Sequence, residues 1–320
     1  MRLPSPAVLA VFAAAAALAQ CRPLRVDDIA ATTSPEPEAT SVTGRALHAP
    51  PLAAERRKAL EENLARAEAD FATRPDDVEA IIWLGRRTAY LNRFRDAITV
   101  FTRGIARHPD DIRLYRHRGH RYISVREFRK AIADLERATR LIAEKNIPDQ
   151  VEPDGDPNPQ NVPTSTSHFN IWYHLGLAYY LEGDFENAAR AYRECMKFSQ
   201  QNHDSLVATS DWLYMTLRRL GRKAEAEEVL KPITAELKVI ENASYWNRLL
   251  MYKGLKTPEE LLGPKDDPVD LATYGYGVGN WYLYTGQRDR AREVFQRVVA
   301  SPQWNAFGYI AAEVDLARMK

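Results

Sequence analysis

The chain has 320 residues, of which 45% are hydrophobic and 27% charged, with 44 Lys and Arg against 43 Asp and Glu. This composition excludes a disordered or collagen-like protein, and a net charge of +1 excludes a whole-molecule field that would draw the protein to nucleic acid or to an anionic membrane. Two cysteines, Cys21 and Cys195, are too few for a disulfide framework or a cysteine-rich zinc site. Any partner must therefore be selected by a local surface.

Residues 1–19 are predicted to be a signal peptide. Arg2 precedes an apolar run that is too short to span a bilayer comfortably, and Ala17-Leu18-Ala19 fits a general signal peptidase. The run into Cys21 resembles a bacterial lipobox, but Gln20 stands where that motif prefers Gly, Ala or Ser. We therefore expect soluble export to the periplasm or cell envelope; a lipid anchor on Cys21 and an uncleaved anchor are the alternatives.

Residues 20–51 are predicted to be a disordered tether. Ser, Thr, Pro and acidic residues dominate this segment without helical or strand periodicity. Contact with a membrane is expected only if Cys21 is lipidated.

A recurrence with a period of 34 residues begins after the tether. Three residues recur 34 positions later, Pro75 as Pro109, Gly85 as Gly119 and Ala97 as Ala131. Small residues at fixed places allow two helices to cross closely, and apolar residues recur at helical spacing. The period therefore predicts stacked pairs of helices.

This pattern resembles the tetratricopeptide repeat family. The repeat from Val78 fills the large, leucine, glycine, alanine, aromatic, small and proline positions of the family pattern with Ile81, Leu84, Gly85, Ala97, Phe101, Gly104 and Pro109. It departs from the pattern at Thr88, where the family has tyrosine. The resemblance implies an all-α fold, a right-handed solenoid of paired antiparallel helices over residues 52–320. The resemblance indicates the fold far better than it indicates the function.

The repeats are expected near residues 78–111, 112–145, 169–202, 207–240 and 272–303, with a degenerate repeat at 241–265. A helix over about 52–72 precedes them, and a helix at 304–320 is expected to cap the solenoid and keep it soluble. Residues 146–168 form a Pro-rich insertion, expected to drape over one end of the groove. Turn residues between paired helices, predicted to be left-handed, are Asn92, Gly183, Gly221 and Gly286.

The candidate partner-binding residues are those that the family pattern places on the concave face: Arg86, Tyr90, Arg113, Arg116, His117, His120, Asn170, Tyr173 and His174. Residues 78–145 carry 16 Lys and Arg against 8 Asp and Glu. Arginines interleaved with aromatic residues suit a planar anion such as a carboxylate. We expect protonation of His120 near its ordinary pKa of about 6.5 to strengthen such binding. The alternative is an ordinary solvated basic face.

Two patterns in the sequence have metal-ligand character. His117, His120 and His174 fall on neighbouring groove positions, but the nearby arginines would repel a cation. The acidic run from Asp154 resembles the start of a calcium loop, but Pro159 and Ser165 occupy the positions that require Gly and Glu. No metal and no cofactor are therefore predicted.

The sequence contains no phosphate-binding loop, nucleophile elbow or zinc-protease motif. The favoured hypothesis is a non-catalytic exported scaffold that binds a peptide or partner protein in its groove, with an acidic or carboxylate-bearing segment as the ligand and no nucleic acid. One alternative is an enzyme or enzyme subunit with a site between the groove histidines and the 146–168 insertion. Another is an envelope assembly factor that acts through convex or edge surfaces. Cys195 is predicted to be a buried structural residue.

Overall fold

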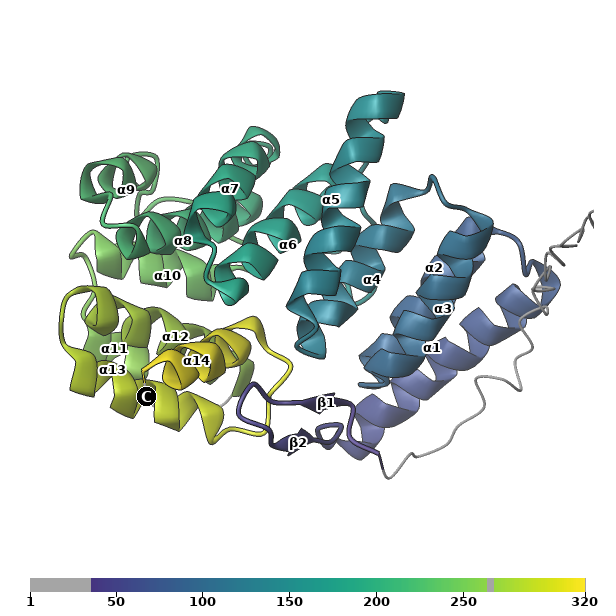
Figure 1. Ribbon diagram of the computed structural model, residues 1–320, viewed down its shortest axis with the longest axis horizontal. Helices are drawn as coiled ribbons and strands as arrows, with labels where there is room; N and C mark the ends of the chain where they lie inside the picture. Colours follow the sequence, from purple (N-terminus) through teal and green to yellow (C-terminus); the bar gives the residue numbers. More distant parts are fainter. Residues whose placement is uncertain (1–35, 264–267, 320) are drawn as a thin grey trace, which may run out of the picture.

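The computed structural model describes residues 36–263 and 268–319. In chain order its elements are β1 (Ala39–Thr40), β2 (Ala46–Leu47), α1 (Ala54–Thr73), α2 (Val78–Tyr90), α3 (Phe94–Arg107), α4 (Ile112–Ser124), α5 (Phe128–Lys145), α6 (Ser167–Glu182), α7 (Phe185–Ser199), α8 (His203–Arg219), α9 (Lys223–Leu230), α10 (Ala243–Tyr252), α11 (Pro258–Leu262), α12 (Pro268–Tyr284), α13 (Arg288–Val299) and α14 (Phe307–Arg318). The helices follow an arc from α1 over α5 to α9 and back to α13 (Figure 1). The predicted all-α solenoid is confirmed.

The recurring acidic turn explains where the first helix of each early repeat begins. The Asp77 side chain accepts a hydrogen bond from the backbone amide of Ala80, and Asp111 does the same for the amide of Arg113. An oxygen acceptor at this position satisfies an amide that has no partner within the helix. The Pro-Asp-Asp recurrence thus marks the starts of α2 and α4.

Glycines set the close crossing of paired helices, as the periodicity predicts. A Cβ atom at Gly85 would lie 2.4 Å from Cε1 of Phe101, and one at Gly279 would lie 2.5 Å from Cε1 of Phe295. Real Cβ contacts are longer than this, so a larger residue would force the helices apart. The paired helices α2 and α3, and likewise α12 and α13, can pack only because these positions lack a side chain.

Left-handed turn residues separate the helices of a pair. The predicted positions all have positive φ, at 61° for Asn92, 88° for Gly183, 73° for Gly221 and 88° for Gly286. Arg126 is a further member that the sequence analysis missed, with φ 67°. The left-handed conformation is energetically unfavourable for arginine, so contacts of its side chain must compensate for the strain.

The predicted disordered tether is wrong for its described part. Residues 36–51, called the strap below, form the antiparallel hairpin of β1 and β2, in which Ala39 and Leu47 are buried. Glu38 accepts hydrogen bonds from the backbone amide of Phe94 at 2.8 Å and thereby caps α3. The polar composition of this segment suggests disorder, but residues far away in the sequence supply its hydrogen-bond partners and order it. The predicted signal peptide and the rest of the tether lie outside the described residues.

The prediction of a solubilising terminal helix is also wrong. The run from Gly308 to Asp315 in α14 is buried, because α12 and α13 cover one side and the inner surface of the arc covers the other. Its two buried acids are paired, Glu313 with Arg126 at 3.0 Å and Asp315 with Arg219 at 2.8 Å. The helix could be mistaken for an amphipathic cap because these acids look solvent-facing in sequence alone.

The strap and the C-terminal segment close the arc. β1 and β2 lie between α14 and the helices α1 to α3 (Figure 1). The Val42 amide donates to Glu313 at 2.9 Å, and the Trp304 indole donates to the carbonyl of His48 at 2.6 Å. Asn92 donates to the carbonyl of Pro50 at 3.3 Å. The first repeat and the last helix are therefore joined through the strap.

Candidate functional site

The insertion turns into the inner side of the arc between α5 and α6. Its two arms are tied by the bridge between Val151 and Thr166 and by a hydrogen bond of 3.0 Å from the Glu152 amide to the Ser165 carbonyl. Its tip rests on α2, where a Cβ at Gly155 would lie 2.0 Å from the hydroxyl oxygen of Tyr90. Only glycine permits that approach, so the tip is fitted against the helix.

Arginines of α1, α2 and α4 hold the insertion. Arg116 pairs with Glu152 at 3.0 Å, and Arg56 pairs with Asp156 at 2.5 Å. The guanidinium of Arg86 donates to the carbonyl of Pro153 at 2.8 Å. The chain thus binds an acidic segment of its own on the basic face that the sequence predicts.

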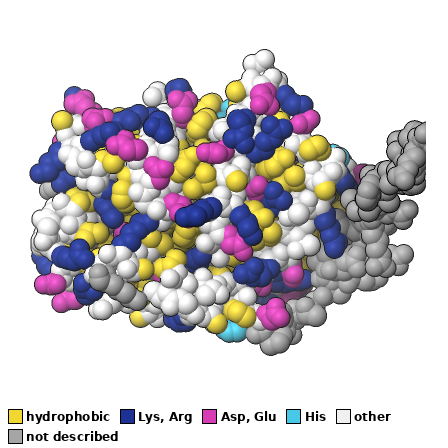
Figure 2. Space-filling model, in the orientation of Figure 1, with side chains coloured by type: hydrophobic (Ala, Val, Ile, Leu, Met, Phe, Trp, Pro, Cys, Tyr) yellow, Lys and Arg dark blue, Asp and Glu magenta, His cyan; other side chains and the backbone are white. Residues whose placement is uncertain are grey.

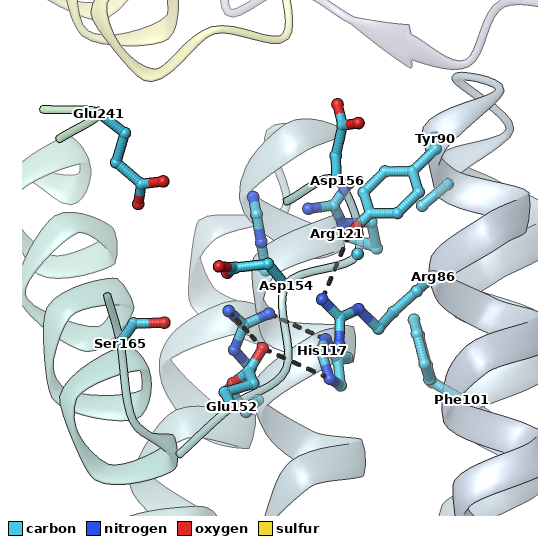
Figure 3. A pocket seen from close by; sticks show the side chains of 14 residues that line it. Arg86, Tyr90, Phe101, His117, Arg121, Glu152, Asp154, Asp156, Ser165 and Glu241 are labelled. Carbon is cyan, nitrogen blue, oxygen red and sulfur yellow. Dashed lines mark hydrogen bonds and ion pairs between the residues drawn. The ribbon is translucent and has the colours of Figure 1, made fainter. Parts of the chain in front are cut away.

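A pocket of about 260 Å³ remains between α2, α4 and the insertion. Figure 3 shows Arg86, Tyr90 and Arg121 on one side of it, and Asp154 and Glu241 on the other. Five of the predicted partner-binding residues line this pocket: Arg86, Tyr90, Arg116, His117 and His120. The fold brings these five together from two successive repeats.

The other four predicted residues are engaged elsewhere. Arg113 pairs with Asp111 and Glu79, and Asn170 donates to Glu152 at 3.0 Å from beneath the insertion. Tyr173 is buried against Tyr245, with 3.3 Å between the hydroxyl oxygens, and His174 packs against Phe307 of α14. The insertion thus covers the groove at Asn170, and α14 covers it at His174.

The pocket histidines are neutral at physiological pH. Burial, reinforced by Arg116, Arg86 and Arg121, lowers the pKa of His117 well below its ordinary value. Burial and the charge of Arg121 do the same to the pKa of His120. The expectation that His120 titrates near its ordinary pKa is therefore wrong, because the ring lies in a cationic, desolvated environment.

The structure also brings together the two halves of the alternative enzyme site, the histidines and the insertion. The Nε2 atom of His117 lies 3.8 Å from a carboxylate oxygen of Glu152, which is too far for a hydrogen bond. Its Nδ1 atom lies 2.8 Å from a guanidinium nitrogen of Arg116. A guanidinium can only donate, so this nitrogen accepts, and the imidazole is pinned in one tautomer. Within residues 36–263 and 268–319, no group of three His, Cys, Asp or Glu side chains could hold a metal ion.

Arg121 is a pocket residue that the sequence analysis did not select. Its guanidinium lies 5.5 Å from the ring of Phe94, and no carboxylate of the described residues pairs with it. Burial, with the charges of Arg116 and Arg86, lowers its pKa to about 9. The signal was available, because Arg121 follows the predicted residue His117 by four positions on α4, and this spacing places two side chains on one helix face.

Glu241 and Asp154 complete the acidic side of the pocket. Glu241 comes from the segment between α9 and α10 and accepts hydrogen bonds from Thr164 and Asn158. Burial raises the pKa of Asp154, and the neighbouring charge of Glu241 adds to the effect. No sequence pattern signals the approach of Glu241, because 76 residues separate it from Ser165, the nearest pocket residue before it in the chain.

Outside the pocket, the visible face carries Lys and Arg interspersed with Asp and Glu (Figure 2). Cys195 is buried and hydrogen-bonded to Thr209 at 3.3 Å, and burial raises the pKa of its thiol to about 12. The thiol is therefore unreactive. None of the helices in the described part of the chain has the length and apolar character needed to cross a membrane.

The tetratricopeptide repeat family matches at two places, residues 169–202 and 275–303. Among solved structures, MamA has a TM-score of 0.42 at 16% identity, over 63% of this chain and 96% of its own. YrrB, described as a TPR protein with an unusual peptide-binding site, has a TM-score of 0.41 at 13% identity, over 77% and 95%. A kinesin light chain of Podosopora anserina has a TM-score of 0.41 at 17% identity, over 72% and 96%. No curated protein matches the sequence.

Proposed function

Because the chain is a tetratricopeptide repeat protein, we propose that it is an exported, non-catalytic scaffold that binds a carboxylate-bearing peptide segment of a partner protein. The binding site is the pocket between α2, α4 and the insertion. Stacked repeats supply a rigid surface on which such a segment is held without rearrangement of the framework.

The observation that carries this proposal is the way α2 and α4 hold the insertion. Arg116 binds a side-chain carboxylate of the insertion, and Arg86 and Arg87 bind its backbone carbonyls at 2.8 and 2.6 Å. These are the contacts that a guest peptide needs, a charged anchor and main-chain hydrogen bonds. Arg121 is the donor that the insertion leaves unused, so it is the assigned anchor for the carboxylate of the guest.

The non-catalytic part of the proposal is supported by the state of the pocket histidines. None of them is hydrogen-bonded to a hydroxyl in the described residues, and burial keeps them neutral. A nucleophile activated by a base would need such a contact. The pocket offers charge and donors for binding.

Export rests on residues 1–19 and has its own test. Mass spectrometry of the mature protein is expected to find a chain that begins at Gln20 with an unmodified Cys21. A diacylglycerol group on Cys21 would instead establish the lipid-anchored alternative.

Binding is tested with fluorescent decapeptides rich in Asp and Glu. The dye is placed on the amino terminus, and each peptide is made with a free carboxyl terminus and with an amide. We expect the free carboxylate to bind more tightly, and Arg121→Gln to weaken it by about tenfold, the value of one charge-assisted hydrogen bond.

Arg129→Gln is the matched control, because Arg129 lies outside the pocket with 88% of its side chain exposed. If Arg121→Gln binds every peptide as the parent does, the pocket is not the site. A convex or edge surface would then become the better candidate.

A further inference from the structure

Two ion pairs lie at the pocket, and four further charged side chains that line it form no ion pair. Arg116 is neutralised by Glu152, and Asp156 by Arg56. Apart from these, the pocket is lined by the cations Arg86 and Arg121 and by the anions Asp154 and Glu241. The remaining charges balance, so recognition in this pocket depends on where a ligand places its charges.

No ion pair joins any of these four groups to an opposite charge in the described residues, although the charge of Arg86 partly offsets the rise in the pKa of Asp154. Arg86 donates to the carbonyl of Pro153 and lies 3.4 Å from the hydroxyl of Tyr90, which are uncharged acceptors. Glu241 accepts from a hydroxyl and an amide, and the Oδ2 atom of Asp154 is buried with no hydrogen-bond partner. Arg86, Arg121 and Asp154 are half-buried, and a half-buried charge without an ion pair gains from a ligand of opposite charge.

The unpaired charges are separated across the pocket. In Figure 3 the carboxylates of Asp154 and Glu241 lie on one side, and Arg86 and Arg121 lie on the other. The acids repel each other, which together with burial raises the pKa of Asp154, and the arginines repel each other, which contributes to the lowered pKa of Arg121. The charge of Arg86 offsets only part of the rise in the pKa of Asp154, so each side still gains from a counter-charge.

The size of the pocket limits the ligand. Its volume of about 260 Å³ lies just below the range of roughly 300–1,000 Å³ that is typical for drug-sized ligands. Tyr90 and Phe101 add ring surface to its wall. The dimensions suit one or two amino-acid residues and exclude a folded segment.

We propose that this pocket binds a small zwitterion, a free amino acid or a dipeptide, with its α-carboxylate at Arg121 and Arg86 and its α-ammonium at Asp154 and Glu241. The inference rests on the proposed function for one point, that the arginine side receives a carboxylate. It adds the ammonium group as a second charge that the pocket recognises. The ligand is therefore a molecule whose amino group and carboxyl group are both free. The scaffold would then respond to a small ligand seated between its second and fourth helices.

The experiment begins with a thermal-shift screen of the full exported chain. The probes are the twenty standard amino acids and the twenty dipeptides Xaa-Ala, each at millimolar concentration. A ligand that binds only the folded state raises the unfolding temperature. We expect at least one probe to do so, and a hit among amino acids but not dipeptides, or the reverse, identifies the length.

The best probe is then titrated by calorimetry beside its N-acetyl and its carboxamide derivatives. Loss of either end charge is expected to weaken binding by at least tenfold. Arg121→Gln should remove the preference for the free carboxylate, and Asp154→Asn the preference for the free ammonium, while Arg129→Gln leaves both unchanged. Glu241→Gln is the second test of the acidic side if Asp154→Asn unfolds.

The outcomes separate the two proposals. A folded chain that binds none of the forty probes overturns the zwitterion inference, as does equal binding of the N-acetylated form. If the dye-labelled acidic peptides still bind through Arg121 in either case, the proposed function stands, because those peptides have a blocked amino terminus. If neither set binds, both proposals fail.

Discussion

The inner face of the arc differs between its two ends. Along α2 and α4 it carries arginines and histidines around a pocket, with the insertion as its wall. Along α8, α10 and α12 the same face is closed, and the ion pair between Arg248 and Asp211, 2.6 Å apart, is fully buried. Equivalent repeat positions thus become a polar cavity or a sealed core, depending on which part of the chain covers them.

The closed end shows why charged residues on the inner face do not by themselves indicate a ligand. Asp211 and Arg248 neutralise each other's charge, as do Asp315 and Arg219. At the open end, Arg121 and Asp154 lack such partners in the described residues. The difference between paired and unpaired charge, not the number of charges, distinguishes a core from a site.

Asp211→Ala should have the largest effect, because it leaves Arg248 buried without its counter-ion. We expect a loss of about 3–5 kcal/mol in the free energy of unfolding. Arg193→Ala, which removes one side of a solvent-exposed pair with Glu225, should cost under about 1 kcal/mol. Urea titration measures both. Similar losses for the two variants would show that the closed end is not sealed.

Gly85→Leu should come next, at about 2–4 kcal/mol, through overpacking against Phe101 at the α2–α3 crossing. The change tests whether the open end has a packed core beneath its polar surface. Thermal unfolding is the measurement, and an unchanged transition would contradict the helix register described above.

Glu313→Ala should cost about 1.5–3 kcal/mol, because it removes the acceptor of both Val42 and Arg126. The strap should be released while the repeats remain folded. Hydrogen exchange is expected to accelerate at the amide of Val42 and to stay slow in α6. Acceleration throughout the chain would instead mean that closure is required for the repeats to fold.

The smallest effect concerns the pH dependence set by the histidines of the open end. Their folded-state pKa values lie below the unfolded value, so the unfolded chain binds more protons and stability falls as pH drops below about 6.5. The slope that the histidines contribute fades as pH rises above about 7. His120→Gln should reduce the loss between pH 6.5 and 5.5 by at most about 1 kcal/mol, as measured by urea unfolding at each pH. An unchanged slope in the variant would mean that His120 is solvated.

The repeats could be predicted from the sequence because their determinants are local. Gly85 meets Phe101 sixteen residues later, and Asp77 caps the helix that follows it. The concave position of Arg86, Arg116 and His120 follows from the same register. This register makes the side of the pocket formed by α2 and α4 predictable.

The rest of the site depends on contacts between distant segments. Neither the entry of the insertion nor the approach of Glu241 has a periodic signature, and the burial of α14 depends on the curvature of the whole arc. Arg126 illustrates the limit, because its left-handed backbone makes sense only beside Glu313 and Trp304, 187 and 178 residues away. Composition alone also assigned the strap to disorder, although Glu38 caps α3.

Closure by the strap constrains how far apart the first and the last repeat can lie. An open array can gain or lose a repeat by duplication or deletion, because each unit touches only its neighbours. Here His48 and Trp304 must meet, so an added pair of helices would part the ends that the strap joins. Loops are the places where length can change without opening the arc, and the insertion between α5 and α6 is one of them.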